Sequence, residues 1–249
     1  MKLKKHLGQH FLKDRNVVRR IIESGGISER DRVVEIGPGG GALTEEILNR
    51  NPKEVVLIEV DSDWVNYLKQ KFGDKVGIFH ADATEFNFSE LPGRWKFFGN
   101  LPYNVSTAII RNILTHRKSF DSGVFMVQKE VAERLTSKRG KSYGYLPALL
   151  HPFFKIERLF DVHPRAFTPP PKVVSTVVRM VPTGFDMEEE ELVEFENFLK
   201  RAFSKRRKKL KKNVEIPEGF EEFGERRAEE ISPSEFLNLF RALKGRRGE

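Results

Sequence analysis

Residues 31–60 read DRVVEIGPGGGALTEEILNRNPKEVVLIEV, and this stretch decides the fold. Residues 31–36 are an apolar run that ends in a glycine-rich turn. Residues 41–50 have a helical pattern that ends at Asn51 and Pro52, and residues 54–60 are a second apolar run. A strand, a crossover helix and a second buried strand are typical of a parallel sheet with helices on its faces.

The same alternation continues along the first part of the chain. The expected strands are residues 76–80, 95–99, 123–127, 153–162 and 173–181, and the expected helices are residues 63–72, residues 106–116 and the segment after residue 127 through Leu135. Residues 137–145 are basic and contain glycine, which favours a mobile loop. These patterns predict an α/β, Rossmann-like fold with a mostly parallel seven-stranded sheet and helices on both faces.

The pattern changes near residue 183, beyond which only helical periodicity remains. Asp186 with Glu189 is a capping box at one predicted helix start, and Ser232 with Glu235 is a second capping signal. We therefore predict one domain in residues 1–183 and a small all-helical C-terminal domain in residues 184–249.

Composition limits the chemistry of the chain. It has no cysteine, which excludes disulfides, thiolate metal sites and cysteine nucleophiles, and its six histidines show no metal-ligand spacing, so we expect no metal. No apolar stretch approaches the ~20 residues of a membrane span, and we see no signal peptide, so we expect a cytoplasmic protein. The net charge of +8 favours a polyanionic partner such as RNA, although an ordinary basic protein would also fit.

The glycine turn at residues 37–41 predicts a nucleotide-like ligand. Glycines such as Gly37 and Gly39 let a ligand approach the backbone near the positive end of a helix. Glu59, which ends the next strand, can accept hydrogen bonds from ribose hydroxyls. The turn alone leaves a nicotinamide cofactor, S-adenosylmethionine and a plain tight turn as alternatives, because Gly37, Gly39 and Ala42 also match G-x-G-x-x-A.

Asp82 follows the third expected strand in the segment HADA. A carboxylate at that point can accept a hydrogen bond from the adenine amine of a cofactor. The alternative is a surface aspartate that caps the next element.

The segment Asn100-Leu101-Pro102-Tyr103, after the fourth expected strand, indicates the chemistry. The exocyclic nitrogen of adenine is a poor nucleophile because its lone pair is delocalised into the ring. The side-chain oxygen of Asn100 and the backbone carbonyl of Leu101 can accept hydrogen bonds from both of its hydrogens and draw it toward tetrahedral geometry. Tyr103 offers a ring on which a flipped base can stack. The plain alternative is a proline turn with a half-buried aromatic.

Several segments together resemble the KsgA-type small-subunit ribosomal RNA adenine N6,N6-dimethyltransferase family. They are GQHFL at residues 8–12, EIGPGGGALT at 35–44, HADA at 80–83, GNLPYNVST at 99–107 and FTPPPKVVSTVVRM at 167–180. The resemblance implies a Rossmann-like methyltransferase fold with S-adenosyl-L-methionine as cofactor and S-adenosyl-L-homocysteine as product. It also implies dimethylation of two adjacent adenosines near the 3′ end of small-subunit (16S) ribosomal RNA in a pre-30S assembly intermediate.

The resemblance also assigns cofactor contacts. It implies that His10 and Leu12 line the cofactor pocket, that Gly37 lies under the methionine part, and that Glu59 holds the ribose and Asp82 the adenine. Many members of the family have Asn where this chain has His10. A backbone contact at that position would survive the change, whereas a side-chain contact would not.

For the acceptor base, the resemblance implies that Asn100 polarises the amine and that Tyr103 is the stacking ring. It further implies that Phe167 packs on the base from another side. A simple core or hinge aromatic is the plain alternative for Phe167.

Residues 201–212 carry eight basic residues in twelve, a density that can follow a phosphate backbone. The candidate RNA contacts are Lys205, Arg206, Arg207, Lys208 and Lys209, then Lys138, Arg139 and Lys141, and more weakly Lys2, Lys4 and Lys5. The alternative is a solvated helix end offset by the acidic residues 218–230. We thus expect residues 1–183 to bind the cofactor and catalyse, and residues 184–249 to contact RNA.

Three other kinds of function remain open: an adenine methyltransferase with a different substrate, a non-catalytic binding protein and a dehydrogenase. DNA adenine methyltransferases use a similar motif of Asn or Asp with Pro and Tyr, usually with Pro at the Leu101 position. Relatives that methylate large-subunit ribosomal RNA use it too, commonly with Ile at that position. A non-catalytic RNA-binding assembly or transcription factor could retain the fold. A nicotinamide-dependent dehydrogenase would explain only the glycine turn. We expect a monomer.

Overall fold

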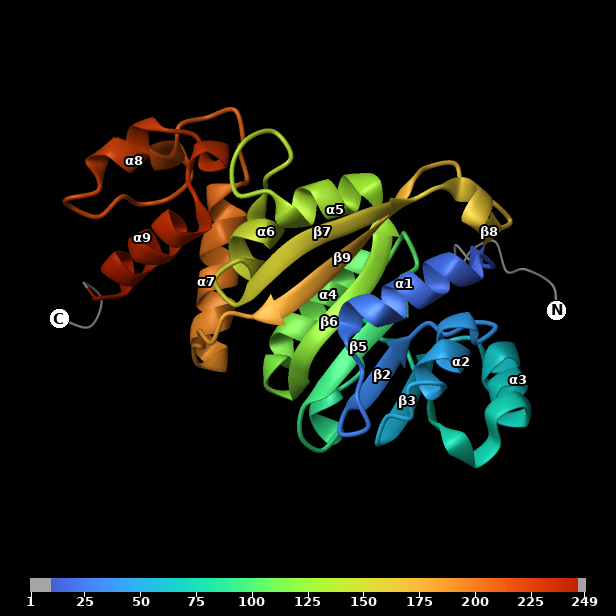
Figure 1. Ribbon diagram of the computed structural model, residues 1–249. Coiled ribbons are helices and arrows are strands. Elements are labelled where there is room, and N and C mark those ends of the chain that lie inside the picture. Colours follow the sequence, from blue (N-terminus) through green and yellow to red (C-terminus); the bar gives the residue numbers. More distant parts are fainter. Residues whose placement is uncertain (1–9, 246–249) are drawn as a thin grey trace. The chain divides into compact units, whose positions relative to one another are not determined.

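The computed structural model describes residues 10–245, and the chain divides into two compact units (Figure 1). The first unit comprises the residues up to 132 together with residues 157–181. The second comprises residues 133–156 and the residues from 182 onward. Residues 133–156, which the expected boundary near residue 183 would assign to the first domain, thus lie with the C-terminal helices. None of the helices within residues 10–245 is long and apolar enough to cross a membrane.

A seven-stranded sheet organises the first unit, as the sequence predicts. Its order is β4 (Gly77–His80), β3 (Glu54–Glu59), β2 (Arg32–Ile36), β5 (Trp95–Asn100), β6 (Phe120–Gln128), β9 (Ser175–Pro182) and β7 (Phe154–Val162). The pairs from β4 to β6 are all parallel, and β9 runs antiparallel to β6. The carboxyl ends of β2, β3, β4 and β5 therefore meet at one edge of the sheet.

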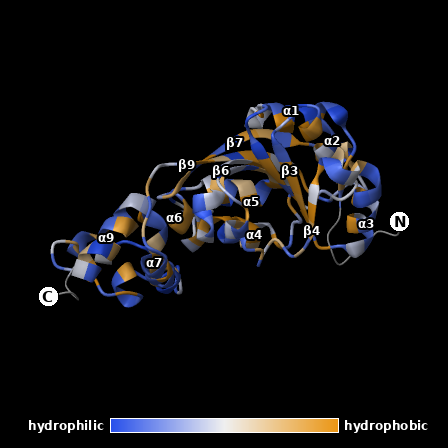
Figure 2. Ribbon diagram, turned by 90° about the horizontal axis from the view of Figure 1, so that it is seen from below, coloured by the Kyte–Doolittle hydropathy of each residue, from blue (hydrophilic) through white to orange (hydrophobic). Residues whose placement is uncertain are grey.

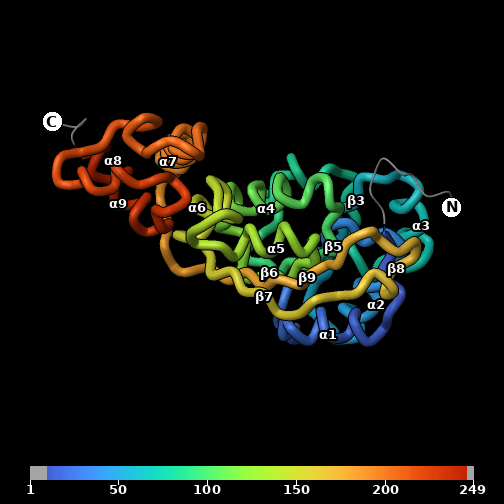
Figure 3. Tube along the Cα trace, turned by 90° about the horizontal axis from the view of Figure 1, so that it is seen from above, coloured from blue at the N-terminus to red at the C-terminus, as the bar shows by residue number. Residues whose placement is uncertain are grey.

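Helices cover both faces of this sheet (Figures 2 and 3). One face carries α1 (Arg15–Gly25) and α2 (Ala42–Leu48), and the other carries α4 (Ser106–Thr115), while α3 (Ser62–Phe72) packs on β3 and β4. The sequence analysis did not predict α1. Its signals are nevertheless present, because the Asp14 carboxylate accepts the first N–H groups and Gly26 ends the helix with φ +56°.

The apolar core beneath α1, α2 and α3 uses alternate residues of the strands. It includes Ile21, Ile22, Leu43, Ile47, Leu68, Val33, Leu57, Phe98, Val124 and Met126. This alternation follows from the period of two in a strand, which gives each face of the sheet its own set of side chains.

A line of phenylalanine rings fills another part of the core and uses five of the 21 phenylalanines of the chain. Phe79, Phe86, Phe88, Phe97 and Phe120 contact each other in sequence, with successive ring centroids 5.1–5.2 Å apart. Tilted and edge-on aromatic pairs of this kind contribute about 0.5–1.5 kcal/mol each beyond their buried area. The line ties the segment between β4 and β5 to the sheet.

A second, two-stranded sheet was not predicted from the sequence. It pairs β1 (Phe11–Leu12) with β8 (Phe167–Thr168), so that Leu12 lies opposite Phe167. The N–H of Lys13 donates to the carbonyl of Ala166 at 2.8 Å and extends the pairing. This contact brings the first described residues of the chain to the first unit's sheet.

The second unit is mainly helical. It contains the end of α5 (Lys129–Thr136), α6 (Tyr145–Leu150), α7 (Glu189–Ala202), α8 (Glu221–Glu225) and α9 (Pro233–Gly245). The capping signal at Ser232 and Glu235 is confirmed, since the Glu235 carboxylate accepts from the Ser232 N–H at 2.6 Å. The predicted capping box at Asp186 and Glu189 is wrong: α7 begins at Glu189 without a side-chain cap, and the Asp186 carboxylate accepts instead from the N–H of Met187.

Of residues 137–145, predicted as a mobile loop, Tyr145 begins α6, and residues 137–144 form no helix or strand but are held to other parts of the second unit. The N–H of Gly140 donates to the carbonyl of Glu229 at 2.8 Å. The Arg206 guanidinium donates to the carbonyls of Lys141 and Tyr143 at 2.8 and 2.9 Å.

Glu35, in the middle of the paired strand β2, is a carboxyl buried in the core with 1% exposure. Burial raises its pKa to about 8, and only the Thr44 hydroxyl, which donates to it at 2.6 Å, and the nearby Glu59 modify that effect. The folded protein therefore keeps a proton on Glu35 at neutral pH, whereas the unfolded chain releases it.

Glu35→Gln should make the stability of the protein less dependent on pH. Because the folded pKa of Glu35 is raised to about 8, the contribution of its protonated form to stability is full at acidic pH and is lost as pH rises through that range. Relative to the variant, its free energy of unfolding should fall by about 1.4 kcal/mol per pH unit from about pH 5 to about pH 8. Denaturant unfolding of both proteins at several pH values measures this, and parallel pH curves would contradict it.

Gly99→Ala should destabilise the first unit. A Cβ at Gly99 would lie 2.8 Å from the backbone oxygen of Ile36 and 2.8 Å from Leu101 Cδ2, and the oxygen belongs to a paired strand that cannot move freely. Such overpacking costs about 1–3 kcal/mol, measurable by thermal or denaturant unfolding. Gly144→Ala is the matched control, since Gly144 has φ −155° and no heavy atom within 4 Å of a new Cβ. Equal stability of both variants would show that β2 and β5 are not packed this closely.

Candidate active site

The ends of four parallel strands bring the predicted site residues of the first unit together. The N–H of Gly37, just after β2, donates to the carbonyl of Ile58 in β3 at 2.9 Å, and Ala81, just after β4, donates to the carbonyl of Glu59 at 3.0 Å. A Cβ at Gly37 would lie 3.9 Å from the carbonyl oxygen of Asn100. The glycine turn, Glu59, the HADA segment and Asn100 therefore share one edge, as expected for parallel strands.

The glycine turn wraps around the carboxylate of Glu59. Gly37 and Gly39 have φ of +67° and +50°, a backbone conformation that favours glycine. The N–H of Gly39 donates to Glu59 Oε2 at 3.1 Å, and the N–H of Asp61 donates to Oε1 at 3.0 Å. Burial raises the pKa of Glu59, and these two N–H groups oppose that shift. The carboxylate is thus held at the turn, and each oxygen keeps a lone pair for a further donor.

Asp82 is exposed at the same edge, after β4. Its Oδ1 accepts from the N–H and the hydroxyl of Thr84, both at 2.8 Å, while Oδ2 has no hydrogen-bond partner among the described residues. The sequence analysis missed Asn112 of α4, whose buried amide donates to the carbonyls of Ala83 and Phe86 at 3.0 and 2.9 Å. Asn112 holds the turn that presents Asp82.

Asn100 has a fixed amide. Its Nδ2 donates to the backbone carbonyl of His10 at 2.9 Å, which leaves Oδ1 without a partner in the described part of the chain. Leu101 is buried, and its N–H donates to the carbonyl of Met126 at 3.1 Å. The free polar atom of the Asn100 side chain is therefore an acceptor, not a donor.

Tyr103 is half-buried and held at two places. Its hydroxyl hydrogen-bonds the hydroxyl of Ser175 in β9 at 2.7 Å, and its ring stacks on the ring of His10 with centroids 5.5 Å apart and planes 30° apart. Burial raises the pKa of the Tyr103 hydroxyl. Ser175 is a residue that the sequence analysis missed, since nothing in the local pattern links it to Tyr103.

Leu12 and Phe167 lie in the core of the first unit. They are opposite each other in the β1–β8 pair and are 7% and 1% exposed. In this conformation Phe167 therefore has no open face for another ring. Phe11, between His10 and Leu12, covers the glycine turn: a Cβ at Gly39 would lie 2.8 Å from the Phe11 ring, which in turn contacts Trp64 of α3 with centroids 5.0 Å apart.

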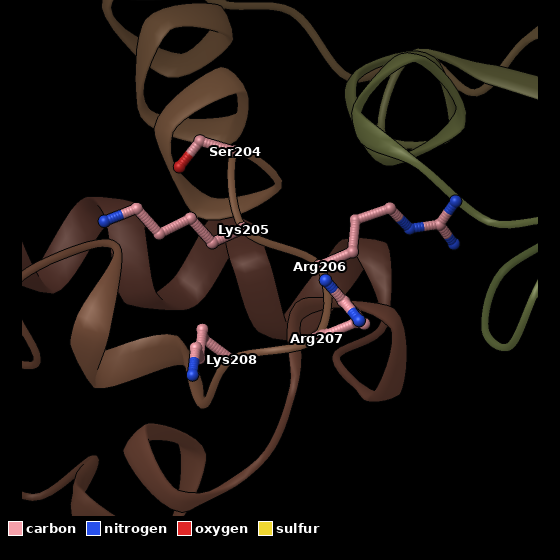
Figure 4. Close-up of a pocket in the computed structure, with 5 residues that line it drawn as sticks. All are labelled: Ser204, Lys205, Arg206, Arg207 and Lys208. Carbon is pink, nitrogen blue, oxygen red and sulfur yellow. The ribbon is translucent and has the colours of Figure 1, made fainter.

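The predicted basic segment lies in the second unit, where residues 204–208 line a shallow hollow of about 370 Å³ (Figure 4). Arg206 extends away from it toward residues 141 and 143 and also pairs with Glu229 at 3.2 Å. Lys205, Arg207 and Lys208 are exposed and form no ion pair with any described residue.

Other predicted cations are already paired. Lys209 pairs with Glu225 at 2.5 Å, Lys211 pairs with the same carboxylate, and Arg139 pairs with Glu235 at 2.8 Å. The acidic segment thus offsets part of the basic one. Lys138 is exposed without an ion pair within the described residues. Lys2, Lys4 and Lys5 lie outside the described residues.

Known proteins are similar in sequence to most of this chain. The family model described as Ribosomal RNA adenine dimethylase matches residues 1–244. The ribosomal RNA small subunit methyltransferase A of Lawsonia intracellularis is 44% identical over 211 residues, which is 83% of this chain and 78% of that protein. The protein of the same name from a Sulfurihydrogenibium species is 39% identical over 249 residues, 96% of each chain.

A solved structure is also similar to this chain over most of its length. The crystal structure of a dimethyladenosine transferase from Plasmodium falciparum superposes with a TM-score of 0.78 at 27% identity and covers 96% of this chain and 98% of that one. The family model extends over nearly the whole sequence, and the relatives align along most of their own length. The chain therefore belongs to the ribosomal RNA adenine dimethylase family.

Proposed function

We propose that this protein transfers methyl groups from S-adenosylmethionine to the N6 atoms of two adjacent adenosines near the 3′ end of small-subunit ribosomal RNA. The family and the two relatives named as small subunit methyltransferases support this substrate. The observation that carries the chemistry is the Asn100 amide, whose nitrogen donates to the carbonyl of His10 and whose oxygen has no partner among the described residues, in a residue whose backbone lies beside the glycine turn. We further propose that it acts as a monomer, in the cytoplasm, on a pre-30S assembly intermediate.

The edge formed by β2, β3 and β4 fits S-adenosylmethionine. Gly37 leaves space beside Asn100 that a side chain would occupy, and Glu59 is a buried carboxylate whose oxygens can take further donors such as ribose hydroxyls. Asp82 Oδ2 has no partner within the described chain and can accept from an adenine amine. When bound, the cofactor supplies an electrophilic methyl group on a positively charged sulfur, and the neutral thioether is a good leaving group.

The wall of the pocket includes the start of the described chain. We propose that the backbone of His10 contributes to the pocket, as does Leu12 by holding β1 on β8. Gly39, whose N–H binds Glu59, keeps the carboxylate at the turn.

The residues that we propose act on the acceptor amine are Asn100 and Leu101. Asn100 Oδ1 and the Leu101 carbonyl accept hydrogen bonds from its two N–H groups, which directs the nitrogen lone pair toward the methyl group. Catalysis by these groups is positioning and polarisation, and neither has to take a charge. Tyr103 stacks on the base, which is worth about 1–3 kcal/mol and offsets part of the cost of extruding it. Phe167 would reach the base only after a movement of the β1–β8 pair, because it is buried.

We propose that RNA phosphates bind four of the predicted cations of the second unit, which are exposed and form no ion pair with any described residue. These are Lys205, Arg207, Lys208 and Lys138. Three other predicted cations support this surface through their own partners. Arg206 binds the carbonyls of Lys141 and Tyr143 and pairs with Glu229. Lys209 pairs with Glu225, and Arg139 pairs with Glu235. Such contacts set affinity and salt dependence, while a structured RNA is chosen by its shape.

Asn100→Ala should lower methyl transfer by about 100- to 1,000-fold, the usual effect of losing one preorganised polar group at a reacting centre. Its affinity for S-adenosylhomocysteine should change little, because Glu59 and the glycine turn remain. The measurement is transfer of labelled methyl groups to undermethylated small ribosomal subunits, with large-subunit RNA and DNA alongside, together with calorimetry for the cofactor product.

Each outcome of that assay has a meaning. Label as N6,N6-dimethyladenosine in small-subunit RNA alone supports the proposal. Label in large-subunit RNA or DNA would move the protein to another substrate, and RNA binding without any label would identify a non-catalytic binding protein. Parallel loss of activity and cofactor affinity in Asn100→Ala would remove the role given to Asn100.

The double variant with Arg207→Ala and Lys208→Ala should weaken RNA binding and flatten its dependence on salt. Each lost phosphate contact reduces the slope of log K against log salt by about 0.7–0.9, so the expected change is about 1.4–1.8. The control is the double variant with Lys209→Ala and Lys211→Ala, whose cations already pair with Glu225 and should change the slope by less than half as much. Equal slopes for both double variants would contradict this assignment.

A further inference from the structure

His10 contacts two parts of the acceptor site at once. Its backbone carbonyl accepts from Asn100 Nδ2 at 2.9 Å, and its ring stacks on Tyr103. The ring of His10 therefore covers one face of Tyr103. Because the same residue also contacts Asn100, we take this to be the face on which a base would stack while its amine reaches Asn100.

The space between the two rings is too small for a base. Their centroids are 5.5 Å apart, which is the distance of a direct stacked pair. A base inserted between two rings requires a separation of about 7 Å, twice the 3.4 Å rise of stacked bases. One of the two rings therefore has to leave before the acceptor base can stack.

Of the two rings, Tyr103 is held more firmly. Its hydroxyl hydrogen-bonds Ser175, which is fully buried in β9 and lies opposite Gln128 of β6. The His10 ring is held by its Nδ1, which hydrogen-bonds the Pro169 carbonyl at 2.9 Å in an exposed contact. Rotation of the His10 side chain breaks that bond and the stack, but it leaves the carbonyl that orients Asn100 in place.

We propose that the His10 imidazole occupies the acceptor-base position on Tyr103 and must rotate away before the adenine stacks there. The proposal rests on the proposed function, in which Tyr103 is the stacking ring. His10 then acts as two separate groups. Its carbonyl positions the Asn100 amide, and its ring competes with the substrate.

The competition has a measurable size. The apparent affinity for the base is reduced by the fraction of molecules whose Tyr103 face is free. An aromatic pair of this kind corresponds to a factor of about 2–12, so removal of the imidazole should tighten base binding by about that factor. A residue that only stabilised the fold would not tighten binding when replaced.

The test uses a short single-stranded RNA that carries 2-aminopurine at one position, titrated against the full chain with S-adenosylhomocysteine present. Fluorescence quenching reports the stacking of this adenine-like base, and no methyl transfer is needed. The variants are His10→Ala and His10→Asn, which remove the ring, and His10→Phe, which keeps a ring on Tyr103 but loses the Nδ1 bond to Pro169. Tyr103→Ala gives the level of quenching without the platform.

We expect tighter binding, about 2- to 12-fold, for His10→Ala and His10→Asn, and unchanged or weaker binding for His10→Phe. The Kd of S-adenosylhomocysteine should stay within about twofold in all three, because the residue 10 carbonyl is retained. Weaker binding in His10→Ala would overturn the proposal, since the ring would then contact the base. Equal binding in all the variants, or no quenching above the Tyr103→Ala level in any of them, would overturn it too. The methyl-transfer assay on small subunits fails or succeeds independently, so a wrong substrate is told apart from a wrong role for His10.

Discussion

Parallel pairing of β2 with β3 and β5 is the constraint on which the candidate site depends. Because parallel neighbours end at the same edge, the glycine turn, the Glu59 carboxylate and the Asn100 amide meet there although they are far apart in sequence. The approach is close: the backbone oxygen of Ile36 leaves no room for a side chain at Gly99, and Gly37 leaves open space toward Asn100. A sheet whose strands were even slightly further apart would separate the two halves of the site.

The β1–β8 pair completes the site from outside the sheet. It places Phe11 on Gly39, and the carbonyl of His10, just before β1, accepts from the Asn100 amide, so two adjacent residues contact both the glycine turn and Asn100. The orienting contact comes from the backbone, so a different side chain at residue 10 would leave it in place. The side chain at that position is then free to differ, and in this chain it is an aromatic ring against Tyr103.

Much of the fold and the location of the site could be predicted from the sequence, because buried parallel strands are apolar runs bounded by glycine and polar residues. Residues 54–60, for example, were predicted as a strand, and β3 spans Glu54–Glu59. The strands β1 and β8 could not be predicted, since each has two residues and exists only through its distant partner. The roles of Asn112 and Ser175 were missed for the same reason. The capping box at Asp186 was predicted from a local motif, and the nearer Met187 N–H binds its carboxylate instead.

The sequence also does not show which cations of residues 201–212 are already neutralised by carboxylates. Eight basic residues in twelve suggest a uniform RNA-binding segment, but a dense row of cations also repels itself and is stabilised by nearby carboxylates. The second unit supplies Glu225 and Glu229, and the cations they neutralise alternate with cations that have no ion pair. Arg206, bonded to two carbonyls of residues 137–144, joins the two basic segments and is the cation least able to turn toward a phosphate. The local density of positive charge therefore does not show which cations are free, because the partners of each side chain decide that.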